Sequence, residues 1–352
     1  MGFDIGDFIY VAIIVSAFAA SCLLTPVMRR FAVSVGAVDR PDGKRKLQSA
    51  PVPYFGGAAI VLAFLLAASL GMAYFGMMPK NYLVIAVGTL LIAVLGLVDD
   101  LVDMKAYVKF SGQILIALGT ALAGGAVEYI TLFGKYISLG VFSVPVTVFW
   151  IVLVVNAVNM IDGLDGLACG ISSFSLMALL VSALVNGDTL SAVVCAALCG
   201  ASLGFLPYNL APASIFMGDT GAMALGYVMA SVSVFGFFKG QAFFSIIAPA
   251  LILAVPVTDA MRLFFVRIFN GRNPFSSDRL HIHHKLIDMG FSPRGAVMVL
   301  YVMSALFSIA AIIYIRSRLA AAIIAGVTFL LMLLVRFVPK LPKKRKNKEE
   351  KA

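Results

Sequence analysis

Apolar residues gather into long runs along the chain, and short polar segments between the runs hold most of the charged side chains. A helix needs about 20 apolar residues to cross a bilayer. The runs show no alternation of apolar and polar residues of the kind that marks a half-buried strand. We therefore predict an all-α polytopic membrane protein with about eleven transmembrane helices. The predicted spans are 8–28, 54–76, 81–98, 108–126, 144–161, 167–186, 189–206, 220–238, 243–266, 295–315 and 319–337.

Residues 128–143 depart from this pattern. Two short stretches rich in β-branched and aromatic residues flank Gly134-Lys135, which is typical of two strands joined by a tight turn. We predict a short β-hairpin there. Residues 1–338 are predicted to form one integral-membrane domain. Residues 339–352 form a basic tail that we expect to be disordered.

The composition supports a membrane protein with almost no soluble part. Hydrophobic residues make up 61% of the chain and charged residues 12%, whereas soluble domains carry roughly 25% charged residues. The net charge of +10 does not imply nucleic acid, because Lys and Arg gather in the cytoplasmic loops of membrane proteins.

The basic segments also predict an orientation. They follow the first span, surround the histidines and form the tail. An odd number of spans places all three on the cytoplasmic side. The N-terminus and the hairpin then lie outside, and the C-terminus is cytoplasmic.

Several aspartates lie where a span meets the basic side of the membrane. Ionisable groups at membrane depth are costly and usually functional. A carboxylate just before a helix can also cap it, and both Asp165 and Asp219 qualify. Capping of the helix that follows does not explain Asp99 and Asp100, because the C-terminal end of a helix disfavours negative charge. These acids are Asp99, Asp100, Asp103, Asp162, Asp165, Asp219, Asp259 and Asp278.

Aspartates and asparagines without cysteine predict a site for a hard cation, of which Mg²⁺ is the expected one. Mg²⁺ held by one or two carboxylates usually keeps phosphate oxygens among its ligands. A cytoplasmic site at the bilayer surface can meet a soluble nucleotide donor and a lipid. We infer a membrane phosphotransferase as a hypothesis.

All three histidines of the chain, His281, His283 and His284, lie within four positions. Such a cluster is typical of a site that handles protons, a metal or phosphate. A solvated polar loop is the plainer alternative. The concentration of every imidazole in one segment favours a site.

Five elements in order resemble the polyprenyl-phosphate N-acetylhexosamine-1-phosphate transferase family over nearly the whole chain. One departure is Gln48, which stands where the family often has histidine, and no role is given to it. The elements are Arg45-Lys46 with Pro51-Val52-Pro53 and Gly56-Gly57, then Gly96 to Asp100 with Lys109 and Gln113, then Asn156 to Gly166, then Phe216 to Gly221, and last the segment around His281.

The resemblance makes residues 1–338 a catalytic domain and implies a role for each matching position. The implied metal ligands for Mg²⁺, with Mn²⁺ as a substitute, are Asp219 and Asn159. The implied catalytic residues are Asp99, Asp100, Lys109, His281, His283 and His284. The implied substrate-binding residues are Lys46, Asn156, Asp162, Asp165, Phe216 and Arg279.

The form of the histidine segment resembles the branch that transfers N-acetylglucosamine 1-phosphate from UDP-GlcNAc to undecaprenyl phosphate and releases UMP. That reaction begins teichoic acid, lipopolysaccharide O-antigen or another cell-wall polymer at the cytoplasmic face of the bacterial plasma membrane. The partners are then the UDP-sugar, the lipid acceptor and membrane lipid, with a homodimer left open.

Three alternatives remain at this point. A phospho-N-acetylmuramoyl-pentapeptide transferase belongs to the same family. An intramembrane prenyltransferase would share the Asp-Asp-x-x-Asp pattern from Asp99 to Asp103, but a second repeat of that type is missing from the later loops. A transporter would carry its acids near the membrane midplane and often in repeated halves; here they line one side, and no repeat is seen.

Overall fold

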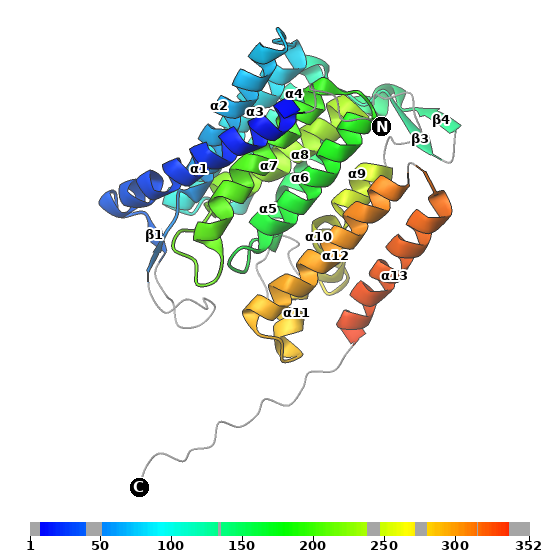
Figure 1. Cartoon of the computed structure of the whole chain (residues 1–352). Helices are drawn as coiled ribbons and strands as arrows, with labels where there is room; N and C mark the ends of the chain where they lie inside the picture. The colour runs from blue at the N-terminus through cyan, green and yellow to red at the C-terminus, as the bar shows by residue number, and fades with distance from the viewer. Residues whose placement is uncertain are drawn as a thin grey trace.

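The computed structural model describes residues 8–39, 51–132, 135–237, 247–271, 280–314 and 316–337. Long helices dominate it (Figure 1), and each predicted span overlaps one or two of them. The helices are α1 (Phe8–Ser34), α2 (Gly56–Tyr74), α3 (Lys80–Val102), α4 (Ala106–Thr120), α5 (Ser143–Ile161), α6 (Leu167–Val185), α7 (Thr189–Asn209), α8 (Gly218–Val232), α9 (Ile247–Ile252), α10 (Ala254–Phe269), α11 (Ile282–Asp288), α12 (Pro293–Ile313) and α13 (Arg318–Phe337).

Within the part of the chain that the structure describes, nine helices are long and apolar enough to cross a membrane. The protein is therefore an all-α polytopic membrane protein. Two predicted spans are not single helices of that length. The 15-residue α8 continues into the π-helical turn η4 (Ser233–Phe237), and the span predicted for 243–266 contains two helices, α9 and α10. The count of eleven spans and their orientation stay predictions.

The break between α9 and α10 has a local cause. Leu253 leaves helical geometry, with φ −97° and ψ 13°, and α10 restarts at Ala254. Pro256 stands in the first turn of α10. Proline has no N–H to give to the carbonyl four residues before it and clashes with that carbonyl in a continuous helix. Hydropathy does not register this break, because both helices are apolar.

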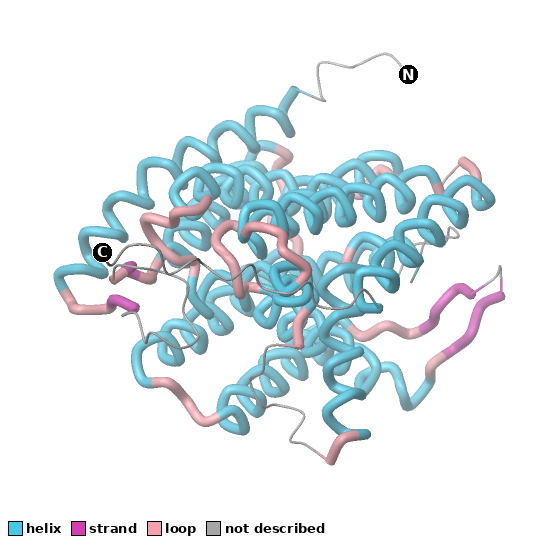
Figure 2. The backbone as a smooth tube through the Cα atoms, turned by 90° about the horizontal axis from the view of Figure 1, so that it is seen from below, coloured by secondary structure: helices cyan, strands magenta, loops and turns pink. Residues whose placement is uncertain are grey.

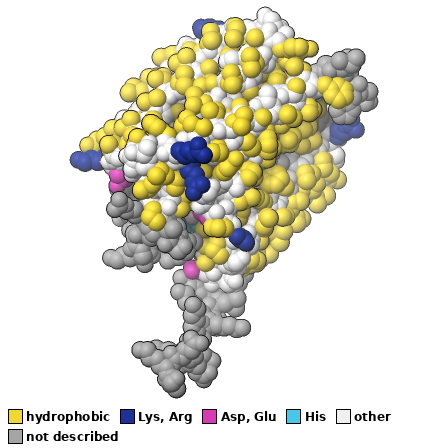
Figure 3. Space-filling model, turned by 60° about the vertical axis from the view of Figure 1, so that its left-hand side comes forward, with side chains coloured by type: hydrophobic (Ala, Val, Ile, Leu, Met, Phe, Trp, Pro, Cys, Tyr) yellow, Lys and Arg dark blue, Asp and Glu magenta, His cyan; other side chains and the backbone are white. Residues whose placement is uncertain are grey.

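The outer helices expose apolar side chains, as lipid contact requires. The face shown in Figure 3 is covered mostly by hydrophobic side chains, with a few charged residues between them. Leu23 on α1 is 74% exposed and Leu115 on α4 is 68% exposed. The interior is built around α6, α7 and α8, where Phe205 and Tyr227 are fully buried.

Two small sheets lie at opposite ends of the molecule (Figures 1 and 2). At one end, β1 (Val38–Asp39) pairs antiparallel with β2 (Val52–Pro53). At the other, β3 (Tyr129–Leu132) pairs antiparallel with β4 (Lys135–Ser138). The second pair lies in the segment predicted as a hairpin. The 3-10 turn η3 (Gly140–Phe142) then leads into α5, and the π-helical turn η2 (Ala121–Gly125) extends α4.

Helix α8 approaches its neighbours closely because glycines line the crossings. A Cβ on Gly57 of α2 would overlap the backbone of Gly221. A Cβ on Gly96 of α3 would lie 2.6 Å from the backbone nitrogen of Thr220. Small residues allow such backbone contact between membrane helices. The N-terminal turn of α8 is thereby fixed against α2 and α3.

Candidate active site

Four helix ends bring together acids and a lysine that are far apart in the sequence. Asp99 comes from the C-terminal part of α3 and Lys109 from the first turns of α4. Asn159 lies in the last turn of α5, and Asp219 lies in the first turn of α8. All four side chains are partly buried.

Lys109 is the centre of this group. Its Nζ lies 2.8 Å from Oδ2 of Asp99 and forms an ion pair with Asp219. It also donates to Oδ1 of Asn159 at 3.3 Å. The Nδ2 of Asn159 in turn donates to Oδ1 of Asp219 at 2.8 Å. One ammonium therefore bridges two carboxylates and an amide, and this fixes the geometry of all three.

Asp100 caps α8 across the helix interface. Its Oδ1 accepts the N–H of Asp219 at 2.8 Å, and its Oδ2 accepts the N–H and the hydroxyl of Thr220 at 3.1 and 2.8 Å. A negative charge is stabilised by the N-terminal end of a helix. Gly218 makes room for this carboxylate, because a Cβ there would lie 2.5 Å from Oδ2 of Asp100.

The interpretation of Asp165 and Asp219 as caps of their own helices is therefore wrong. The first turn of α8 receives its cap from Asp100, and Gly166 begins α6 with no side-chain cap. The Oδ2 of Asp165 instead accepts the N–H of Ala213 at 2.9 Å. Sequence neighbours suggest local capping, whereas the tertiary fold supplies a better-placed partner from another helix.

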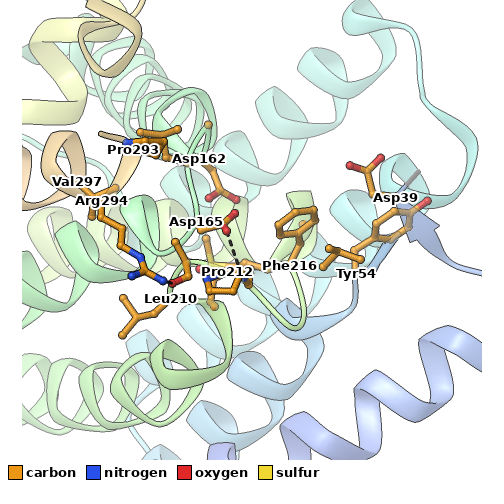
Figure 4. Close-up of a pocket in the computed structure, with 18 of the residues that line it drawn as sticks. Asp39, Tyr54, Asp162, Asp165, Leu210, Pro212, Phe216, Pro293, Arg294 and Val297 are labelled. Atoms are coloured by element: carbon orange, nitrogen blue, oxygen red, sulfur yellow. Dashed lines mark hydrogen bonds between the residues drawn. The ribbon is translucent and has the colours of Figure 1, made fainter. Parts of the chain in front are cut away.

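A pocket of about 1020 Å³ opens beside this group (Figure 4). Asp100, Asn159 and Asp219 line it from the charged group. Residues 162–165 form a second side, residues 209–213 a third, and the start of α12 a fourth. The predicted site residues in its wall are Asp100, Asn159, Asp162, Asp165, Phe216, Asp219 and His284.

Hydrogen bonds tie the loop before α6 to the segment after α7. Asn209 accepts the N–H of Gly166 at 3.1 Å and donates to the carbonyl of Ile215 at 3.1 Å. Tyr301 of α12 donates to the carbonyl of Gly166 at 2.6 Å. Two loops that are separate in the sequence thus form one surface around the pocket.

Phe216 is placed by a parallel strand-like contact. Its N–H donates to the carbonyl of Pro53 at 2.8 Å, and its carbonyl accepts from Gly56 at 3.0 Å. Tyr54 forms a parallel bridge with Phe216. Figure 4 shows Phe216 between Asp165 and Tyr54, with Asp39 beyond them. An aromatic ring at the edge of a polar pocket is suited to stack on a flat ligand.

The histidine segment adjoins the pocket through one member. His284 lines it, whereas His281 and His283 lie behind. The rings of His281 and His283 stack at 5.4 Å, and those of His283 and His284 lie 4.3 Å apart. Both ring nitrogens of His283 are buried and have no hydrogen-bond partner among the described residues.

The surroundings of Asp162 and His283 favour their uncharged forms. Burial, together with the nearby carboxylates of Asp219, Asp100 and Asp165, raises the pKa of Asp162 to about 8. Burial lowers the pKa of His283 to about 3, with the neighbouring rings of His284 and His281 adding to the effect. Near pH 7 the Asp162 carboxyl is therefore mostly protonated and the His283 ring is neutral.

Some predicted residues are not in the pocket wall. Asn156 donates to Oε1 of Gln113 at 2.5 Å and to the carbonyl of Val152 at 2.8 Å, so it joins α4 to α5. Lys46 and Arg279 lie outside the described residues. Their substrate-binding roles stay predictions.

Sequence reasoning missed the contribution of α12. Arg294 and Tyr301 line the pocket, and Arg294 donates to the carbonyl of Ala211 at 2.5 Å. They lie in an otherwise apolar helix with no recognisable motif, so no local signal marks them. Tyr54 was also missed, although it stands between two segments, Pro51–Pro53 and Gly56-Gly57, that were singled out.

An ammonium between carboxylates, beside a pocket that carries both acidic and apolar side chains, is the arrangement expected of an enzyme that handles charged phosphate groups. The chain matches the model of glycosyl transferase family 4 over residues 82–237. It belongs to that family.

Three relatives match most of the chain. It is 38% identical to a Bacillus subtilis protein named probable undecaprenyl-phosphate N-acetylglucosaminyl 1-phosphate transferase, over 87% of this chain and 84% of the relative. It is 34% identical to the decaprenyl-phosphate N-acetylglucosaminephosphotransferase of Mycolicibacterium smegmatis, over 89% and 84%. It is 28% identical to the Escherichia coli undecaprenyl-phosphate alpha-N-acetylglucosaminyl 1-phosphate transferase, over 84% and 81%.

Proposed function

We propose that this protein transfers N-acetylglucosamine 1-phosphate from UDP-GlcNAc to undecaprenyl phosphate and releases UMP. The observation that carries the proposal is the group formed by Lys109, Asn159 and Asp219 beside the 1020 Å³ pocket. The names of the three relatives support the choice of sugar and lipid.

The reaction exchanges one phosphoanhydride for another. An oxygen of the lipid phosphate attacks the phosphorus that carries the sugar, and a new P–O bond forms. The bond from that phosphorus to the oxygen it shares with the uridine phosphate breaks, and UMP leaves. A phosphate monoester has a second pKa near 6, so the attacking group is largely dianionic at neutral pH and needs little help from a base. We propose direct attack.

The charged side chains then have distinct tasks. Lys109 stabilises negative charge on the diphosphate as the bond to UMP breaks. Asp99 holds Lys109 in place and, through Oδ1, accepts the N–H of Met104 at 2.8 Å. Asp100 fixes the backbone of Asp219. Phe216 provides an apolar surface for the uracil ring, with Asp162 and Asp165 beside it.

The donor set fits a Mg²⁺ ion that shares its coordination with the substrate. Asp219 and Asn159 line the pocket and carry side-chain oxygens that contact Lys109, and oxygen is the ligand that Mg²⁺ prefers. Among the described residues, no three His, Cys, Asp or Glu side chains converge to enclose an ion. Asp219 and Asn159 would therefore hold it together with phosphate oxygens and water, and the ion would neutralise diphosphate charge.

A radiolabel assay tests the proposal. Purified enzyme is given UDP-GlcNAc or UDP-MurNAc-pentapeptide, with and without undecaprenyl phosphate and Mg²⁺. We expect UMP release only from UDP-GlcNAc, only with the lipid, and only with Mg²⁺ or Mn²⁺. UMP release from the pentapeptide donor alone would overturn the choice of sugar.

We further propose that the pocket faces the cytoplasm of a bacterial cell. The basic segments, including the tail, support this orientation. A reporter fused after Ala352 should then report a cytoplasmic location, and one fused before Met1 an external location. Two reporters on the same side would mean an even number of spans.

A further inference from the structure

Asp259 is a buried carboxylate for which the reaction above has no use. It lies on α10 and is 2% exposed. An unpaired charge in such a place is costly. The partners of its carboxylate are the ring of His281, whose Nδ1 lies 3.0 Å from Oδ2, and the N–H of Ile282, 3.3 Å from Oδ1.

This contact fixes the tautomer of His281. An ionised carboxylate only accepts hydrogen bonds, so Nδ1 of His281 must carry the proton. In the neutral ring Nε2 then keeps its lone pair. A carboxylate that orients an imidazole and fixes its tautomer in this way is a recurring device in enzymes.

The same face of α10 holds the backbone beside His281. Arg262, one turn after Asp259, donates from Nη1 to the carbonyl of Leu280 at 3.2 Å. Asp259 and Arg262 of α10 therefore bind two consecutive residues just before α11, His281 and Leu280. The start of the histidine segment is held by α10.

Contacts between the three histidine rings connect His281 to the pocket. His281 stacks on His283, and His283 contacts His284, which lines the pocket. The ring of His283 packs closely against the loop before α6, where Gly163 leaves room for it: a Cβ there would lie 2.5 Å from its Nε2. The three rings form a continuous row from Asp259 to the pocket.

We propose that Asp259 is a positioning residue that acts through His281, holding the row of three imidazoles so that His284 presents its ring to the substrate. The proposal rests on the proposed function for the nature of that substrate. Under this proposal α10 places the histidines, and the break after α9 determines where α10 begins.

Steady-state kinetics test whether Asp259 acts through His281. We expect Asp259→Asn, which keeps size and one acceptor oxygen, to lower kcat/KM for UDP-GlcNAc by about 10–100-fold, the usual cost of losing the partner that orients a functional histidine. The KM for undecaprenyl phosphate should not change. When His281→Ala is already present, adding Asp259→Asn should lower kcat/KM by less than about a further twofold.

The matched control is Asp188→Asn. Asp188 caps α7 by accepting the N–H of Ser191 at 3.1 Å, and asparagine caps a helix nearly as well as aspartate. This variant should keep wild-type activity. Near-normal activity of Asp259→Asn, or losses that multiply in the double variant, would overturn the proposal.

A second measurement does not depend on enzyme activity. The chain has three histidines, so protein labelled with ¹⁵N-histidine gives three imidazole signal sets, and the set lost in His281→Ala belongs to His281. We expect the neutral His281 ring to carry its proton on Nδ1 only. In Asp259→Asn, the Nδ1–H tautomer should no longer be the only one present. An Nε2–H ring in the wild type would disprove the contact. If the ring is Nδ1–H but UDP-GlcNAc is not turned over, the proposed function fails and the positioning contact stands.

Discussion

The charged group around Lys109 and the histidine row around His283 border the same pocket, but they are built in opposite ways. In the first, the ammonium of Lys109 joins two carboxylates and an amide, and the four side chains come from four helices. In the second, a neutral ring with no hydrogen-bond partner among the described residues lies between two others. Charge holds the first region together, whereas the middle of the second is held by ring packing against a loop and only its His281 end by the carboxylate of Asp259.

This difference suggests different tasks. Groups that carry full charge can offset charge that develops on a diphosphate. Neutral imidazoles offer one donor and one acceptor each, so they are better suited to orient a substrate. Substitutions in the charged group should therefore abolish turnover, whereas those in the histidine row should weaken it.

The largest effect is expected for Asp219→Asn. The change removes the negative charge that pairs with Lys109 and would hold Mg²⁺, while keeping the size of the side chain. We expect kcat to fall by at least about 1000-fold, with normal extraction and gel filtration. Asp103→Asn is the control, because Asp103 is exposed with a left-handed backbone that asparagine tolerates. Turnover near the wild-type rate in Asp219→Asn would refute the metal role.

Lys109→Met should reduce kcat by about 100–1000-fold. It should also lower Tm, because two partly buried carboxylates lose their shared counter-charge. Lys109→Arg should not restore activity, since a planar guanidinium cannot replace a compact ammonium between three acceptors. Lys105→Met, at an exposed lysine one turn earlier, is the control. A drop in Tm with unchanged kcat would make Lys109 a structural residue only.

Gly163→Ala tests whether the histidine row depends on packing. The added methyl group would lie 2.5 Å from Nε2 of His283, so the ring must move. We expect a fall in kcat/KM of about 10–100-fold, the scale of a small misplacement at a reacting centre. Gly119→Ala, where a Cβ meets nothing within 4 Å, should be neutral. Equal activity in the two alanine variants would show that the row tolerates displacement.

The same row should need no zinc. Oxygen-preferring Mg²⁺ does not require imidazole, so a zinc-specific chelator in excess Mg²⁺ should leave the wild-type rate unchanged. Loss of turnover under these conditions would identify the histidines as ligands of a transition metal.

Among the variants, the smallest loss is expected for Asp100→Ala, and it is a loss of thermal stability. Three hydrogen bonds to the start of α8 disappear, and buried donors left without partners cost about 1–3 kcal/mol. Tm should fall by a few degrees. Asp100→Asn, which keeps one oxygen, should fall between alanine and wild type in a thermal unfolding series. An unchanged Tm for alanine would show that water replaces the cap.

The sequence was sufficient to locate the long apolar helices and seven residues of the pocket wall. Apolar runs report membrane helices directly, and acids at span ends are rare enough to mark a site. The sequence did not predict which groups these acids bind in the folded protein. Asp100 binds a backbone 119 positions away, and Asp259 binds a ring 22 positions away. Such pairings depend on how helices cross. Arg294 and Tyr301 gave no local signal for the same reason.

The glycine contacts of α8 have a consequence for how substrates enter and leave. At Gly57 and Gly221 no side chain separates the two backbones, and Gly96 meets the start of α8 in the same way. Helices in such contact cannot slide past one another without collision. The side of the pocket formed by Asp100 of α3 and the start of α8 is therefore stiff. We expect this side to keep its place when substrates enter and products leave.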